Sequence, residues 1–342
     1  MREYPDDRRF MAYHNLRDGD AVATTHGLIF YVFGYDHPVD RYHGFLKYVP
    51  EELVPSFDLD WLPVTWQRGG TTLARPTEVY SPENYPRLIE GFCCSLPEYL
   101  FRDEALERWM ITIPKHLISK VYIPSRQLMK IARRGLRDPL EDQALELLSL
   151  LSERSGVSPG FLGVHGSISL GTHHRGSDID LSVYGAENYQ KTKTALLELE
   201  GEGFLSLKRN DRFEEKRLNR GDFRGVDFVV NATRRFSEID LRCTRYHPLG
   251  PVEVECRCSS AKESVFRPAI YRVKECSPTS SFDTRVEDVF EVVSMIGLFR
   301  DIISDGEVMR ARGILEEVKV GGDTNLRLVV GTTRPGEYVD WG

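Results

Sequence analysis

Apolar and polar positions change their spacing along the chain, and the changes divide the sequence into four parts. Residues 1–78 contain short β-rich runs separated by proline and glycine, and 27–33 is the best of them. In 79–156 the apolar residues have helical spacing, interrupted by prolines. In 157–245 strand-like and helix-like runs alternate, and in 246–342 strand-like runs return. The pattern predicts a small β module, a helical segment packed on a core, an α/β core and a C-terminal β domain.

The clearest helix is predicted from residue 139 to about residue 155. Asp138 can cap the first turn, Pro139 suits the first helical position, and apolar side chains recur on one face. Gly156 ends the pattern.

The C-terminal part is predicted to be a β-barrel-like domain, with the OB fold as the candidate type. Its strand-like runs are 252–256, 265–273, 289–303, 308–320 and 326–330. About five strands in fewer than about 100 residues fit a small barrel.

Two carboxylates mark the last strand of the stretch 163–181, around which the α/β core is organised. Because side chains alternate along a strand, Asp178 and Asp180 share one face while Ile179 and Leu181 point into a core. Two neighbouring acids repel each other, and oxygen ligands at this separation suit Mg²⁺. The structural alternative is that Asp178 caps a turn and Asp180 forms a surface salt bridge.

A Gly-Ser pair lies upstream of the two acids. Gly166 allows the backbone to approach a ligand closely, and Ser167 opens a short helix whose free N–H groups attract phosphate. A phosphate site followed by a metal-binding carboxylate pair predicts phosphoryl or nucleotidyl transfer.

Two later runs each carry one acid between apolar residues, and each acid is a candidate for a third metal-facing carboxylate. The run 225–230 contains Asp227 and the run 238–242 contains Asp240. A buried acid is costly unless it is paired or bound to a metal. Asp227 is preferred because its run has the stronger strand character, and Asp240 is the alternative.

Other polar groups have two interpretations each. The basic residues between 207 and 225 form either a mobile loop beside a phosphate site or a solvated loop with interleaved acids. His173 and His174 are expected to be an exposed loop pair rather than ligands. The basic and aromatic residues between Arg41 and Lys47 are expected on a barrel exterior, with an accessory nucleic-acid surface as the alternative.

Composition narrows the class of protein. The 342 residues are 41% hydrophobic and carry a formal net charge of −7, so the chain is not a globally basic nucleic-acid binder. No apolar run reaches the ~18 residues of a membrane span, and the charged N-terminus lacks an apolar signal core. A soluble, cytoplasmic protein is expected, in which the six cysteines are buried thiols.

The Gly166-Ser167 pair and the run Ser177-Asp178-Ile179-Asp180-Leu181 resemble the signature of the DNA polymerase beta-type nucleotidyltransferase superfamily. Arg175-Gly176-Ser177 is similar to archaeal-type CCA-adding enzymes and minimal nucleotidyltransferases. The resemblance covers about residues 160 to 245, and it implies an α/β (α+β) core with a mixed sheet.

The resemblance also implies nucleotide-binding roles. Ser167 and the backbone at Gly166 would hold the terminal phosphates of a nucleoside triphosphate, and Arg175 would contact the nucleotide. The acceptor hydroxyl would attack the α-phosphorus in line, with release of pyrophosphate.

In the same family pattern, Asp178 and Asp180 would bind two Mg²⁺ ions. A third acid, Asp227 or alternatively Asp240, would join one of these ions and help to activate the acceptor hydroxyl.

The leading hypothesis is therefore a Mg²⁺-dependent nucleotidyltransferase that transfers a nucleoside monophosphate to a hydroxyl. The alternative is a non-catalytic RNA- or protein-binding module that retains the fold. RNA 3′ ends, protein hydroxyls and small molecules are all compatible acceptors, and the flanking β modules favour a macromolecule such as RNA. The sequence leaves the oligomeric state open.

Overall fold

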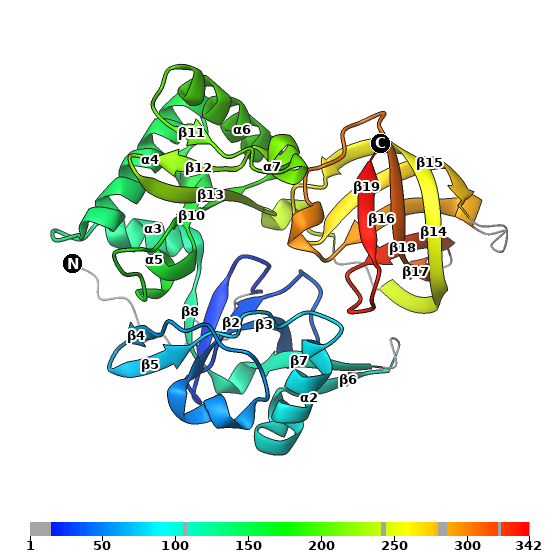
Figure 1. Cartoon of the computed structure of the whole chain (residues 1–342), viewed down its shortest axis with the longest axis horizontal. Helices are drawn as coiled ribbons and strands as arrows, with labels where there is room; N and C mark the ends of the chain where they lie inside the picture. Colours follow the sequence, from blue (N-terminus) through cyan, green and yellow to red (C-terminus); the bar gives the residue numbers. More distant parts are fainter. Residues whose placement is uncertain (1–14, 105–107, 241–243, 280–285, 321–322, 342) are drawn as a thin grey trace.

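The computed structural model describes residues 15–104, 108–240, 244–279, 286–320 and 323–341. These residues form three sheets, of eight, five and six strands. Each sheet is the centre of one unit, and Figure 1 shows the N-terminal unit below, the core at the upper left and the C-terminal unit at the upper right. None of the described helices is long and apolar enough to cross a membrane.

The N-terminal unit is a sheet with the strand order β4-β5-β3-β2-β1-β8, to which β7 adds by pairing with β3, and β6 by pairing with β7. Its strands are β1 Ala21–Thr24, β2 Ile29–Val32, β3 Arg41–Pro50, β4 Trp66–Arg68, β5 Thr71–Ala74, β6 Leu100–Asp103, β7 Arg108–Pro114 and β8 Ile118–Tyr122. Its helical segments are η2 Glu51–Ser56, α2 Asn84–Ser95, η3 Pro97–Tyr99 and η4 Lys115–Leu117.

The expected helical segment 79–156 is only partly helical, because strands β6, β7 and β8 lie within it. The strand residues themselves, 108–114 and 118–122, are rich in β-branched and aromatic side chains, which favour strands. The backbone groups of β7 and β8 are instead satisfied by pairing with β3 and β1. These pairings join residues far apart in sequence, so local periodicity could not reveal them.

The core unit has a mixed sheet, as expected, with the strand order β11-β12-β13-β10-β9. Only the pair β10 and β13 is parallel among its described pairs. Its strands are β9 Leu162–Val164, β10 Ile179–Tyr184, β11 Ser206–Leu207, β12 Arg220–Phe223 and β13 Val226–Thr233. Its helices are α3 Pro124–Ala132, α4 Pro139–Ser155, η5 Pro159–Phe161, α5 Gly166–Leu170, α6 Ala186–Gly201, α7 Arg212–Arg217 and η6 Phe236–Glu238.

The helix predicted from residue 139 is confirmed as α4. The Asp138 side chain accepts hydrogen bonds from the backbone N–H groups of Leu140 and Glu141, and Gly156 follows in the left-handed conformation at φ 68°. The apolar face of α4 packs with α6 and with strands β10 and β13 in one buried cluster.

The C-terminal unit is a sheet with the order β14-β15-β16-β18-β17-β19, and additional pairing of β14 with β17 makes it a partly closed ring. Its strands are β14 Thr244–Glu263, β15 Ala269–Pro278, β16 Val289–Ser294, β17 Val308–Val320, β18 Asp323–Val330 and β19 Tyr338–Trp341, with η7 Val286–Asp288 and η8 Gly297–Phe299 between them. The predicted strand 289–303 was too long, because the chain leaves the sheet after Ser294. The OB type stays a prediction.

Cysteines are only partly buried. Cys256, Cys258 and Cys276 lie in the core of the C-terminal unit, as expected, whereas Cys93 and Cys94 on α2 are exposed. Cys243 lies outside the described residues.

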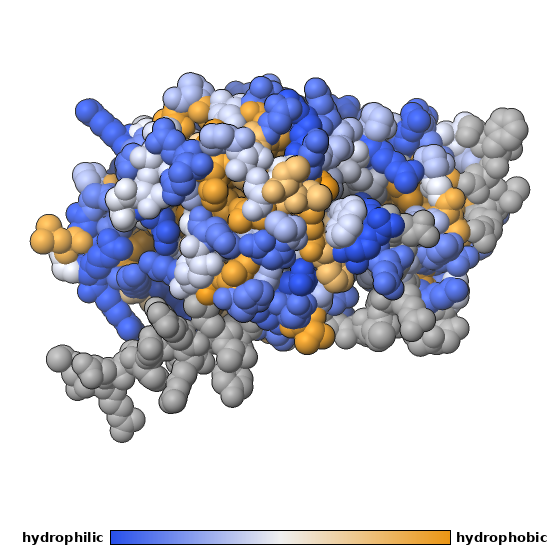
Figure 2. All heavy atoms as spheres, turned by 90° about the horizontal axis from the view of Figure 1, so that it is seen from below, coloured by the Kyte–Doolittle hydropathy of each residue, from blue (hydrophilic) through white to orange (hydrophobic). Residues whose placement is uncertain are grey.

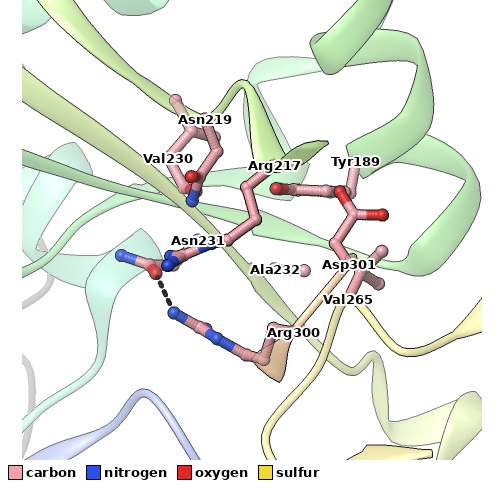
Figure 3. Close-up of a pocket in the computed structure, with 9 residues that line it drawn as sticks. All are labelled: Tyr189, Arg217, Asn219, Val230, Asn231, Ala232, Val265, Arg300 and Asp301. Carbon is pink, nitrogen blue, oxygen red and sulfur yellow. Dashed lines mark hydrogen bonds between the residues drawn. The ribbon is translucent and has the colours of Figure 1, made fainter. Parts of the chain in front are cut away.

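The three units contact one another through buried and polar groups. Figure 3 shows the contact between the core and the C-terminal unit, where Arg300 donates a hydrogen bond to Asn231 on β13 at 2.9 Å. Arg267 of the C-terminal unit forms an ion pair with Asp18 of the N-terminal unit at 2.8 Å. On the face seen in Figure 2, hydrophilic side chains cover most of the coloured surface, and apolar ones lie between them in small groups.

Candidate active site

A cavity of about 310 Å³ lies between the N-terminal sheet and the core. One wall comes from the N-terminal unit and the other from β10, β12, β13 and the segment around α5. The lining residues are Tyr31, Lys47, Tyr48, Trp66 and Arg75 on the first wall, and Gly166, Ser167, His174, Gly176, Ser177, Asp178, Asp180, Arg220 and Val229 on the second.

The two predicted carboxylates face this cavity. Asp178 directly precedes β10 and Asp180 is its second residue, and both line the cavity. Ile179 and Leu181, which alternate with them, are fully buried in the core cluster. The alternation expected from the sequence therefore directs both acids toward one space.

Gly166 is in contact with one of these acids. Its φ is +60°, and a Cβ atom added there would lie 1.8 Å from Oδ2 of Asp180. The sequence interpretation left this space for a ligand, whereas in the structure the Asp180 carboxylate fills it. Only glycine fits between β10 and the start of α5.

The Ser167 hydroxyl is buried and also lines the cavity. Ser167 is 8% exposed, and its Oγ has no hydrogen-bond partner among the described residues. A buried hydroxyl without a protein partner is free to bond to a polar ligand or to water in the cavity. Helix α5 has five residues and is capped by Gly171. Its dipole therefore attracts an anion only weakly, and the Ser167 hydroxyl is the stronger polar group here.

Electrostatics inside the cavity favour a bound cation between the acids. Burial, with a smaller contribution from the neighbouring Asp178 carboxylate, raises the pKa of Asp180 to about 7. Burial lowers the pKa of Lys47, on the opposite wall, to about 8, with a smaller contribution from Arg75. Two carboxylates sharing a half-buried site are the oxygen donors that Mg²⁺ prefers, so the residues fit this ion.

The preferred third acid, Asp227, lies on the cavity face of the sheet but outside the cavity lining. Asp180 pairs with Val229 in parallel register, so Asp227, two residues earlier on β13, points to the same side as Val229. Its carboxylate is exposed and forms an ion pair with Lys208, with Nζ 2.5 Å from Oδ2. A role for Asp227 as a metal ligand requires that it exchange Lys208 for the metal.

The alternative third acid, Asp240, is exposed and follows η6. The predicted strand 238–242 is wrong for residues 238–240, where Glu238 ends the short helix and caps it through its side chain. Residues 241 and 242 lie outside the described part of the chain.

Arg175, the third predicted nucleotide contact, is exposed and is not among the cavity-lining residues. Its neighbours His174, Gly176 and Ser177 line the cavity instead. The Ser177 hydroxyl accepts a hydrogen bond from the His174 backbone N–H at 3.0 Å, which holds this segment in a compact turn.

A different acidic group brings three possible ligand atoms together. The ligand atoms of this group, from Asp138, Glu141 and His173, all lie within 4.8 Å of one another. Among the described residues, the three predicted acids do not come together in this way. Asp138 Oδ2 lies 2.5 Å from Nε2 of His173, and Glu141 pairs with Arg134 at 3.0 Å. The group links the start of α4 to the turn before Asp178, so His173 is not the exposed side chain that was expected, whereas His174 is exposed.

The basic segment 207–225 contains the helix α7 and the strand β12 rather than one loop. Most of its cations are paired with acids: Lys208 with Asp227, Arg209 with Glu200, Arg212 with Asp340, Lys216 with Glu307, and Arg224 with Glu146. Arg220 lines the cavity, and it is opposite Val229 in the pairing of β12 with β13. The interpretation as a solvated segment with interleaved acids therefore describes most of these residues. Only Arg220 is placed where it could contact a phosphate in the cavity.

Sequence reasoning missed the wall contributed by the N-terminal unit. Lys47 was grouped with surface residues, and Tyr31, Tyr48, Trp66 and Arg75 carried no motif at all. Strand alternation in β3 separates Lys47 from the buried Leu46 and Tyr48 but does not say which surface it faces. That information comes from the packing of the sheet against the core, where the ring centres of Tyr31 and His165 lie 4.6 Å apart.

Comparisons with known proteins bear on the family of the chain and on its core. Residues 145–248 match a family model described as a nucleotidyltransferase domain. The chain is 30% identical over 350 residues to "Uncharacterized protein MJ1086" of Methanocaldococcus jannaschii, an alignment that covers 95% of this chain and 98% of the relative. No solved structure matches the chain. The chain therefore belongs to the same family as this archaeal relative, and its core is a nucleotidyltransferase domain of the DNA polymerase beta type.

Proposed function

We propose that the protein is a Mg²⁺-dependent nucleotidyltransferase, which transfers a nucleoside monophosphate from a nucleoside triphosphate to a hydroxyl group and releases pyrophosphate. The observation that carries the proposal is the shared cavity of Asp178, Asp180 and the unpartnered hydroxyl of Ser167. All three residues lie within the segment that matches the nucleotidyltransferase domain.

Asp178 and Asp180 would hold the metal, with Asp227 as the third ligand once Lys208 has moved away. Bound Mg²⁺, two ions in the proposed mechanism, would neutralise charge on the phosphates during in-line attack.

The chain's own residues bind and orient the substrate. The Ser167 hydroxyl can donate its hydrogen to a phosphate oxygen, which satisfies a group that is otherwise orphaned. Arg220 brings a positive charge to the same cavity from β12. The N-terminal sheet faces the acids from the opposite wall of the cavity.

For the acceptor we propose a macromolecule, with RNA as the first candidate. The support is the presence of β units on both sides of the core, which offer surface for a partner larger than a metabolite. Nucleoside triphosphates and RNA are both available in the cytoplasm, which is where we expect the protein to act.

The direct test is incubation of the full chain with α-labelled nucleoside triphosphates, Mg²⁺ and separate pools of RNA, protein and small molecules. Label should enter one pool with the wild-type chain and none with the double variant Asp178→Asn, Asp180→Asn. Glu187→Gln, which changes an exposed acid on α6 outside the cavity, is the control and should retain transfer. Transfer that persists in the double variant contradicts the proposal.

The second candidate is a non-catalytic RNA- or protein-binding module. The ion pair of Asp227 with Lys208 favours it, because this pair withholds the third carboxylate. Calorimetry with ATP or CTP and Mg²⁺ separates the two candidates. Absence of nucleotide binding by the wild-type chain would favour the non-catalytic module.

A further inference from the structure

The N-terminal sheet lies outside the matched nucleotidyltransferase segment 145–248, yet it forms one wall of the cavity. Two cations stand on this wall, Lys47 on β3 and Arg75 directly after β5. Both are half-buried, and both line the space that contains Asp178 and Asp180.

Neither cation has a carboxylate partner at ion-pair distance in the part of the chain that the structure describes. The Lys47 ammonium lies 5.3 Å from the ring centre of Tyr31. Lys47 and Arg75 are also close enough to repel each other. Two arginines of the same unit do pair with acids, Arg41 with Asp40 at 2.9 Å and Arg87 with Asp58 at 2.8 Å. The Asp178 and Asp180 carboxylates on the opposite wall attract Lys47. Once a bound metal neutralises these carboxylates, the like charges of Lys47 and Arg75 in a half-buried space are costly unless an anion occupies it.

The wall that carries these cations is firmly attached to the core. Tyr48 and Trp66 pack edge to face with ring centres 5.2 Å apart. Both belong to a buried cluster that includes Leu170 of α5, the helix opened by Gly166 and Ser167. Lys47 lies on β3, and Arg75 lies between the end of β5 and the bridge of Pro76 with Trp61, so both cations are placed by the sheet that packs on α5.

We propose that Lys47 and Arg75 bind the terminal phosphates of the nucleoside triphosphate from the side opposite Ser167, so that the N-terminal sheet is the second half of the triphosphate site. This inference rests on the proposed function. The triphosphate is the strongest anion in that reaction, and guanidinium and ammonium groups are its usual partners.

The position of the cations favours the triphosphate over the backbone of an RNA acceptor. They lie inside a cavity of about 310 Å³, which is the size of a small-ligand pocket. Single-stranded nucleic acid is usually bound along an open positive groove instead.

The test compares Mg²⁺-dependent binding of a nucleoside triphosphate, diphosphate and monophosphate to the full chain by calorimetry. The variants are Lys47→Met and Arg75→Met, with Lys47→Arg as the conservative variant. Arg102→Met, at an exposed arginine on β6 outside the cavity, is the matched control. Circular dichroism and thermal unfolding check that each variant is folded.

Each methionine variant should bind the triphosphate about tenfold or more weakly, because a charge-assisted contact is lost. Monophosphate affinity should change little, so the preference for triphosphate over monophosphate falls by the same factor. Lys47→Arg should restore most of the affinity, and Arg102→Met should behave as wild type.

Two results overturn the inference while the proposed function stands. One is wild-type triphosphate affinity in both folded methionine variants. The other is a loss of RNA binding in these variants with unchanged triphosphate binding, which would assign the cations to the acceptor. A wild-type chain that binds no nucleotide at all overturns both proposals.

Discussion

At the scale of single residues, Gly166 and Asp180 depend on each other. A side chain at residue 166 would occupy the position of the Asp180 carboxylate, and the backbone there has a φ that L-residues rarely adopt. The glycine is needed because it gives room to the acid that faces the cavity.

Gly166→Ala should therefore abolish nucleotide transfer and lower the free energy of unfolding by about 1–3 kcal/mol. The added Cβ displaces Asp180 and strains the backbone. Gly160→Ala is the matched control, since its Cβ would have no contact closer than 3.9 Å and its φ is not positive. Urea denaturation and the labelled-transfer assay measure both effects, and an active Gly166→Ala variant would contradict the proposed packing.

Asp227→Asn tests the third carboxylate. If Asp227 joins the metal during the reaction, transfer should fall about a hundredfold or more, as for other groups that stabilise a transition state. Stability should change by less than about 1 kcal/mol, because the pair with Lys208 is exposed.

Lys208→Met is the informative partner variant, since it frees Asp227 and should lower the Mg²⁺ concentration needed for activity. Asp240→Asn should leave transfer unchanged. Full activity of Asp227→Asn would remove Asp227 from the site.

At the scale of elements, the turn before β3 depends on a neutral histidine. His37 accepts a hydrogen bond on Nδ1 from the His43 backbone N–H at 3.3 Å, and its Nε2 lies 3.1 Å from the Leu16 carbonyl oxygen. This arrangement needs a proton on Nε2 and none on Nδ1. Burial lowers the pKa of His37 from 6.5 to about 3, with a smaller contribution from His43.

The unfolded chain therefore binds a proton at His37 between pH 6.5 and about 3, whereas the folded chain does not. The free energy of unfolding that neutral His37 contributes is complete above pH 6.5. It is lost as the pH falls from 6.5 to about 3, by up to about 1.4 kcal/mol per pH unit. His37→Asn should flatten this part of the stability profile measured by urea denaturation. His116→Asn, at an exposed histidine, should not. Equal slopes for wild type and His37→Asn would contradict the assignment.

Elements whose signals are local could be predicted. Helix α4 follows from Asp138, Pro139 and Gly156, which act on their own neighbours in the chain. The alternation around Asp178 and Asp180 was equally readable, because strand geometry alone sets it. Strands β7 and β8 were missed because they pair with β3 and β1, which lie far away in the sequence, and no local pattern encodes that pairing.

At the scale of the whole molecule, the ion pair of Asp18 with Arg267 connects the N-terminal and C-terminal units. The side chain of Asp18 is 7% exposed, and burial raises the pKa of its carboxyl group, while Arg267 opposes this rise. Arg267 also lies over the ring of Phe33 at 5.2 Å. Removal of the arginine would leave a buried charge without its partner.

Arg267→Met should therefore destabilise the protein by about 3 kcal/mol or more, and Asp18→Asn in the same chain should recover a large part of this loss. Arg257→Met breaks the exposed pair with Glu275 and should cost less than about 1 kcal/mol. Denaturant unfolding of the wild type, the single variants Arg267→Met and Asp18→Asn, and the double variant measures the coupling. Additive effects of the two substitutions at Asp18 and Arg267 would show that the pair does not connect the units.

The sequence alone predicted the residues of the core wall: two acids on one face of a strand, and a Gly-Ser pair upstream of them at the start of a short helix. These features depend on residues adjacent in the chain and on the geometry of a single strand or turn. The tertiary structure alone decided that Lys47 and Arg75 face those acids, that Lys208 engages Asp227, and that Arg175 stays outside. Such outcomes depend on how separately folded sheets dock, and hydrophobic periodicity carries no information about the partner of a surface.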